Sequence, residues 1–227
     1  MTSELMEFSA KDFLPGARAA FEASCGFQVG NEKHKRMFEL ADNVLDGCID
    51  NLHPRAIISA IDGSALNDDT VSFGGFKFRC PAFSQLDPRL VRRIHLFVLT
   101  VGEFTTSLSG ITATVFADMW GTVFCDESVE AVSNRVNGSV VIYPGLYGLP
   151  LSSVQDICSL LDGKRIGVSV REPSYVMTPI KSCCGIIFEA SGELEQPESK
   201  CEDCIGNKHW CIVCKKKDAI LGLRKQS

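Results

Sequence analysis

The sequence lacks an excess of positive charge and a long apolar run, and its opening residues do not have the pattern of a secretory signal. Its 227 residues carry a net charge of −5, with 23 Lys and Arg against 28 Asp and Glu. Lysines and arginines cluster only in the last residues, 215–225, so we expect no nucleic-acid partner. No run of about 18 apolar residues occurs, so no membrane span is expected. The opening MTSELMEFSAKDF has no basic segment followed by an apolar one, which predicts no secretory signal and a cytoplasmic location.

Recognisable catalytic motifs are also missing. The sequence contains no H-E-x-x-H, G-x-S-x-G or Walker pattern. The four histidines, His34, His53, His95 and His209, are scattered along the chain. His95 opens an apolar stretch, which favours a buried, hydrogen-bonded histidine over a metal ligand. Motifs alone therefore assign no reaction, and whether the chain is an enzyme stays open.

Cysteine, by contrast, is abundant, with 11 residues. The stretch CEDCIGNKHWCIVC holds two C-x-x-C pairs, and its four thiols are Cys201, Cys204, Cys211 and Cys214. Four thiolates suit a tetrahedral zinc or a [4Fe–4S] cluster. The six-residue gap between the pairs is shorter than in most zinc sites, and two disulfides or no metal are further alternatives. A reducing compartment disfavours disulfides, so we predict a zinc or iron–sulfur centre on these cysteines.

Hydrophobic periodicity predicts an α+β fold with an antiparallel sheet, because helix and strand signals do not repeat as βαβ units. Helices are expected over 15–26, 31–53, 87–93, 105–134 and 150–163. Strands are expected over 55–61, 94–102, 139–145, 166–170, 174–179 and 183–190, with a hairpin around Gly74-Gly75. The adjacent Cys183 and Cys184 would point to opposite faces of their strand and are interpreted as small core residues.

Three parts follow from this pattern. Residues 1–190 form the main domain, and the polar, acidic stretch 191–200 is typical of a linker. Residues 201–227 form a small cysteine-rich, metal-binding appendage.

Several stretches, in order, resemble the reactivation domain of cobalamin-dependent methionine synthase. They are NLHPRAIISAI, HLFVLTVGEF, FADMWGTVFCDESVEAV, YPGLYGLPLSSVQDICSLLDGKRIGVSV and SYVMTPIKSCCGIIF. The likeness runs from about Val29 to Glu189. It is closer to stand-alone versions of that domain, some of which end in a cysteine cluster.

The resemblance implies a curved antiparallel sheet flanked by helices. It also implies docking on a corrinoid protein or cobalamin-dependent methyltransferase, an electron donor, and S-adenosylmethionine as methyl donor. Cobalamin would be supplied by the partner, and this chain would be the accessory component. The alternative function is a non-catalytic module that binds a corrinoid protein and carries a structural zinc tail.

Six residues are candidates for the cofactor or docking site. Glu103 follows a predicted strand end, a common position for site residues, although an ordinary loop carboxylate is the alternative. The resemblance adds Asp118, at an acidic position of the long helix, and Lys181, in the matching PIKS motif.

The resemblance also adds the loop with Pro144, Gly145 and Tyr147, but this loop departs from the family pattern. The family has an arginine before its Pro-Gly-Tyr, and Val141 stands in that place. Leu146 stands at the family tyrosine, with Tyr147 one residue later. Because valine cannot pair with a carboxylate as arginine does, we expect weak S-adenosylmethionine binding.

Overall fold

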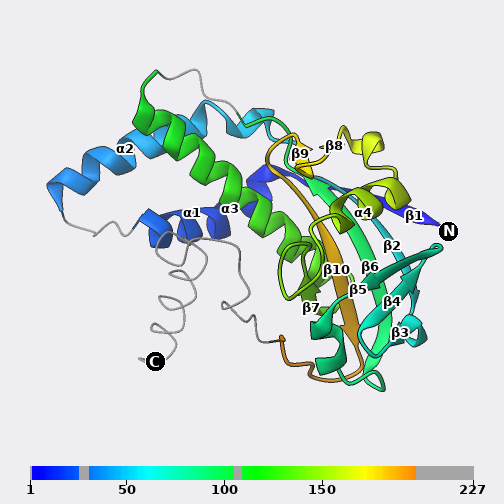
Figure 1. The fold of residues 1–227 in the computed structure, drawn as a ribbon. Helices are drawn as coiled ribbons and strands as arrows, with labels where there is room; N and C mark the ends of the chain where they lie inside the picture. The colour runs from blue at the N-terminus through cyan, green and yellow to red at the C-terminus, as the bar shows by residue number, and fades with distance from the viewer. Residues whose placement is uncertain (1, 26–30, 105–108, 198–227) are drawn as a thin grey trace. The chain divides into compact units, whose positions relative to one another are not determined.

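Over the residues that the structure describes, the chain folds as an α+β protein with one five-stranded antiparallel sheet and four α-helices. Figure 1 shows how they are arranged. The computed structural model describes residues 2–25, 31–104 and 109–197. In spatial order the sheet contains β1 (Ser3–Glu7), β2 (Arg55–Asp62), β6 (Val91–Thr100), β10 (Ser182–Ala190) and β7 (Gly138–Ile142). The helices are α1 (Ala10–Cys25), α2 (Glu32–Asp46), α3 (Ile111–Arg135) and α4 (Ser153–Leu161). The predicted α+β class is confirmed, while the predicted metal-binding appendage, 201–227, lies outside the described residues.

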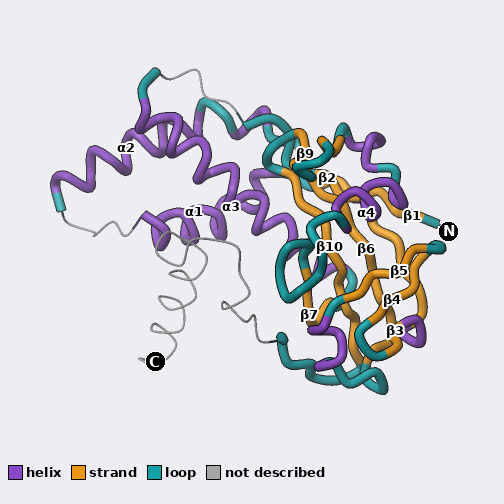
Figure 2. Tube along the Cα trace, viewed as in Figure 1, coloured by secondary structure: helices purple, strands orange, loops and turns teal. Residues whose placement is uncertain are grey.

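Two smaller sheets accompany the main one (Figure 2). One contains β3 (Leu66–Asn67), β4 (Thr70–Phe73) and β5 (Phe76–Arg79), and the other contains β8 (Ser169–Arg171) and β9 (Val176–Thr178). The predicted hairpin is confirmed, with Phe73 opposite Phe76. Gly74 and Gly75 both have positive φ, which a tight hairpin turn requires.

The central strands β6 and β10 of the main sheet are buried on both faces. Along β6, Ile94, Leu96 and Val98 belong to one core, and Phe97 and Leu99 belong to the other, as strand alternation requires. We call the side that packs against α1, α2 and α3 the helical face. We call the side that packs against α4 and the β3–β5 sheet the hairpin face.

Trp120 is the centre of the core on the helical face. Its side chain is 1% exposed and stacks on Phe21 of α1, with ring centroids 3.9 Å apart. The Trp120 Nε1–H donates a hydrogen bond of 2.9 Å to the carbonyl of Ala41 in α2. Trp120 of α3 therefore contacts both other helices: its ring packs on α1 through dispersion forces, and its N–H is hydrogen-bonded to α2.

Two sequence-based expectations fail around the sheet. The predicted helix over Asp87–Arg93 is wrong, because Leu90 N–H closes a single turn on the carbonyl of Asp87 and β6 then begins at Val91. Pairing of β6 with β2 replaces the helix. The strand β1, which carries the charged sequence SELME, was not expected at all.

The end of the folded unit lies within the predicted linker. The chain divides into two units, Met1–Pro197 and Glu198–Ser227. Leu194 is 9% exposed and packs in the core on the hairpin face. Gln196 Nε2 donates hydrogen bonds of 3.1 Å to the carbonyl of Val141 and 3.2 Å to the Tyr147 hydroxyl. These contacts attach residues 194–197 to the first unit.

A chain truncated after Pro197 is expected to unfold in one cooperative transition. Truncation after Gly192 removes the buried Leu194 and should lower the free energy of unfolding by about 2 kcal/mol relative to the longer chain. Chemical denaturation followed by tryptophan fluorescence compares the two. An aggregated or molten 1–197 chain would instead show that the segment from Glu198 onward is integral to the core.

Candidate functional site

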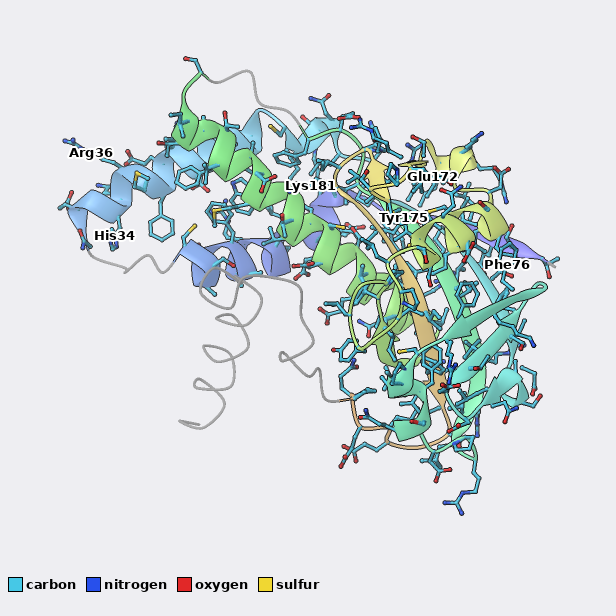
Figure 3. All side chains as sticks on the ribbon, in the orientation of Figure 1. His34, Arg36, Phe76, Glu172, Tyr175 and Lys181 are labelled. Atoms are coloured by element: carbon cyan, nitrogen blue, oxygen red, sulfur yellow. The ribbon has the colours of Figure 1, made fainter. Side chains whose placement is uncertain are left out.

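Lys181 is held against α3 at the start of β10 (Figure 3). Its Nζ lies 2.6 Å from Asp118 Oδ1 and donates a hydrogen bond of 2.9 Å to Thr122 Oγ1. The Lys181 side chain is 13% exposed, whereas that of Asp118 is 69% exposed. Solvent screens the ion pair, so its contribution to stability is small, but the ammonium group is fixed in position.

Gly121 makes this arrangement possible. A Cβ atom at Gly121 would lie 2.9 to 3.2 Å from three side-chain carbons of Lys181. The lysine stem therefore lies directly over the helix backbone, where a larger residue would push it away. Sequence reasoning selected Asp118 and Lys181 separately and did not predict their contact or the role of Gly121.

The ends of β6 and β10 are joined beside this pair. Ser182 Oγ donates to Thr100 Oγ1 at 2.8 Å, and Val101 N–H donates to the carbonyl of Lys181 at 3.0 Å. Glu103 is exposed and follows two residues after Val101. We call Glu103, Asp118, Thr122 and Lys181 the Lys181 corner. In this corner the exposed Asp118 carboxylate pairs with a fixed ammonium, and a second exposed carboxylate, that of Glu103, follows the end of β6.

The loop after β7 is held in a tight turn. Gly145 N–H donates to the carbonyl of Leu149 at 2.8 Å, next to Pro144. Tyr147 has a φ of 58°, a left-handed conformation that costs energy in a residue other than glycine. Its carbonyl accepts a hydrogen bond of 3.1 Å from the Cys80 thiol, and its hydroxyl accepts the bond from Gln196. The surrounding contacts therefore fix both the backbone and the ring of Tyr147.

The candidates form two groups rather than one. Tyr147 packs at the core on the hairpin face, whereas Asp118 and its helix cover the helical face. Ile142 pairs with Ile186, so the Pro144–Tyr147 loop leaves β7 toward the end of the sheet where β10 begins. Within the described residues, no hydrogen bond or ion pair joins this loop to the Lys181 corner. Outside its own loop, Tyr147 is hydrogen-bonded to Cys80, which follows β5, and to Gln196, which lies beyond the end of β10.

The opposite end of the sheet carries a cavity of about 430 Å³. Its lining includes Glu4, Arg93, His95, Arg135 and Glu189, from three strands and the end of α3. His95 is 5% exposed, and its Nε2 lies 3.0 Å from Glu189 Oε2. Burial lowers the pKa of His95, and the hydrogen bond and charge of Glu189 oppose this shift only in part. Sequence patterns placed His95 in the core, but its pairing with Glu189 depends on a strand register that they do not reveal.

The lowered pKa of His95 makes stability depend on pH. The folded state holds a neutral imidazole, whereas the unfolded chain takes up a proton near the ordinary pKa of 6.5. The unfolded state then binds more protons, so the free energy of unfolding should fall as the pH drops below about 6.5. Denaturant titrations over a pH series should show a shallower fall in His95→Gln. A fall as steep in His95→Gln as in the wild type would contradict this assignment.

Metal and membrane features are absent from the part of the chain that the structure describes. There, no group of three or more His, Cys, Asp or Glu residues is placed to hold a metal ion. No helix in the same part is both long and apolar enough to cross a bilayer. The predicted ligands Cys201, Cys204, Cys211 and Cys214 lie outside the described residues.

Comparison with solved structures identifies a similar fold. The structure matches the MetH reactivation domain bound to AdoHcy with a TM-score of 0.50 and 16% sequence identity. The match covers 83% of this chain and 78% of that chain. No family model matches the chain, and no curated protein does. The resemblance seen in the sequence motifs is thus confirmed at the level of the fold.

Proposed function

We propose that this chain docks on a corrinoid protein and serves in the reductive reactivation of a cobalamin-dependent methyltransferase of the methionine synthase type. The observation that carries the proposal is the fold match over 83% of the chain, together with the ordered sequence motifs. The hard chemistry would belong to the cobalamin of the partner. This chain would supply the docking surface and, through the cysteine-rich tail, a metal centre that relays electrons from a donor.

The Lys181 corner and the Pro144–Tyr147 loop are the surface that we assign to docking. Both are held in position by hydrogen bonds to neighbouring elements. Rigidly supported loops and strand ends commonly carry binding residues. The exposed carboxylates of Glu103 and Asp118 would face basic groups of the partner, a contact that governs encounter and orientation.

A binding measurement with a purified corrinoid protein tests this assignment. Asp118→Lys should weaken binding by about tenfold, because it replaces an attractive charge with a repulsive one. Glu130→Lys is the matched control: it makes the same charge change at an exposed position of the same helix and should bind as wild type. Equal affinity in both variants would remove the Lys181 corner from the interface.

The tyrosine in the loop has its own test. Tyr147→Ala should weaken the same binding, whereas Tyr147→Phe keeps the ring and loses only the hydrogen bond from Gln196. Both variants should fold, because the Cys80 thiol bonds to the backbone of residue 147 rather than to its side chain. Unchanged affinity in Tyr147→Ala would exclude the loop from docking.

S-adenosylmethionine is expected to bind weakly. Val141 pairs with Ile187 and packs toward the helical face, so the guanidinium of the family is missing. Lys181, another candidate cation, already contacts Asp118 and Thr122. Loss of one charged hydrogen bond costs roughly 1.5–3 kcal/mol, which is about tenfold or more in affinity. Micromolar binding by calorimetry would contradict this and direct attention to Lys181 or Arg171.

The absence of an arginine at position 141 favours a second candidate function. A chain that lacks the arginine could retain only the docking role, as a non-catalytic module with a structural zinc tail. Protein purified without oxygen separates the two functions. A brown, redox-active preparation supports reactivation, and a colourless, zinc-containing one supports the binding module.

A further inference from the structure

Strand β10 carries two neighbouring cysteines, and each faces another thiol. Cys183 points to the helical face, where its Sγ lies 3.7 Å from Cys125 Sγ of α3. Cys184 points to the hairpin face, where Cys158 of α4 belongs to the same core and raises the pKa of the Cys184 thiol together with burial. The sequence interpretation of Cys183 and Cys184 as core residues on opposite faces agrees with their burial but did not predict these partners.

The Cys125–Cys183 contact joins the same two segments, α3 and the start of β10, that are joined at the Lys181 corner. Lys181 immediately precedes β10 and lies two residues before Cys183 of that strand, and Thr122 and Cys125 are three residues apart on α3. Both thiols are therefore carried by elements that the Lys181–Thr122 hydrogen bond already holds together. A disulfide, with an S–S bond of about 2.05 Å, would require the two side chains to rotate toward each other from their present separation of 3.7 Å.

We propose that Cys125 and Cys183 are a dithiol modification site that forms a reversible disulfide by exchange with a low-molecular-weight disulfide. The Cys125 thiolate attacks one sulfur of the reagent, giving a mixed disulfide and one released thiolate. The Cys183 thiolate then attacks Cys125 Sγ and releases the second. The two protons of the protein thiols end on the two reagent thiols, so the reagent is reduced by two electrons and the protein is oxidised by two.

The order of attack follows from the surroundings of the two thiols. The hydrogen bond to Cys125 and burial raise the pKa of Cys183 well above its usual range, so Cys183 is a poor first nucleophile. Cys125 and Cys183 are both half-buried, so the raised pKa of Cys183 leaves Cys125 as the first nucleophile. On the other face, Cys158 and Cys184 are 8% and 3% exposed, so a reagent in solution should not reach them. This site does not depend on the proposed docking function.

Peptide mapping of the full chain tests the proposal. Reduced protein is incubated with oxidised glutathione, alkylated after unfolding, digested and analysed by mass spectrometry. We expect a peptide joining Cys125 to Cys183, loss of both free thiols in step, and full alkylation of Cys158 and Cys184. Dithiothreitol should restore both thiols. The map also separates these peptides from those of the cysteine-rich tail.

Two variants isolate the steps. Cys183→Ser should trap glutathione on Cys125, and Cys125→Ser should leave Cys183 unmodified. Oxidation should raise the thermal midpoint of the wild type but not that of either variant, because only the wild type gains a cross-link between α3 and β10. Three results would each overturn the proposal. They are a Cys158–Cys184 disulfide that forms first, a link from Cys125 to a tail cysteine, and a failure to modify Cys125 and Cys183 at reagent concentrations that modify the tail.

Discussion

Replacement of Trp120 by alanine is expected to lower the free energy of unfolding by about 3–5 kcal/mol, a large fraction of the stability of a domain this size. The indole is 1% exposed and stacks on Phe21, so its removal leaves a cavity between α1 and α3. The carbonyl of Ala41 also loses its donor inside the core. Urea titration followed by circular dichroism measures the change.

Trp120→Phe is the matched control for this loss. Phenylalanine keeps a ring to stack on Phe21 and loses the Nε1 hydrogen bond and part of the volume, so the destabilisation should be less than half as large. A loss below about 1 kcal/mol in the alanine variant would be too small for a buried aromatic residue. Such a result would show that Trp120 does not anchor the helices as the structure indicates.

The double variant Cys204→Ser, Cys211→Ser is expected to lose its metal entirely. The two C-x-x-C pairs are predicted to supply all four ligands of one centre, and the variant leaves one thiolate in each pair. Wild-type protein prepared without oxygen should contain about one zinc per chain and no colour, or an iron–sulfur chromophore that bleaches on reduction. Elemental analysis and absorption spectra distinguish these outcomes.

The control variant for the metal removes thiols from the main domain. Cys183→Ser, Cys184→Ser should keep the full metal content, because neither residue belongs to a metal-binding group among the described residues. Metal that survives in the tail variant and disappears in this control would move the centre to β10. Loss in both would indicate ligands shared between the tail and the main domain.

Periodic patterns predicted the elements whose burial is one-sided or complete. The apolar run around Leu96 and the repeat around Trp120 were assigned correctly, as β6 and α3. β1 was missed because Glu4 and Glu7 interrupt its apolar pattern, and its pairing with β2 creates the strand. The segment Asp87–Arg93 was predicted as a helix because local helix propensity contains no information about pairing with a distant strand such as β2.

The candidate site was predictable as a set of residues but not as a geometry. Asp118 and Lys181 are 63 positions apart in the sequence, and their contact depends on how α3 crosses β10. The same is true of the Cys125–Cys183 contact and of the His95–Glu189 pair. Each depends on helix packing or strand register, which a single sequence does not encode in any local pattern.

The burial of β6 and β10 on both faces has a thermodynamic consequence. Ile186 and Phe188 of β10 contribute to one core, and Ile187 contributes to the other. If one core unfolded by itself, water would reach the hydrogen bonds between β6 and β10, and the other core packs against these same two strands. The two sides of the sheet therefore share one unfolding equilibrium, although they carry different surface groups. A macromolecule bound at the Lys181 corner should slow amide exchange behind Tyr147 as well, because both regions open through the same global event.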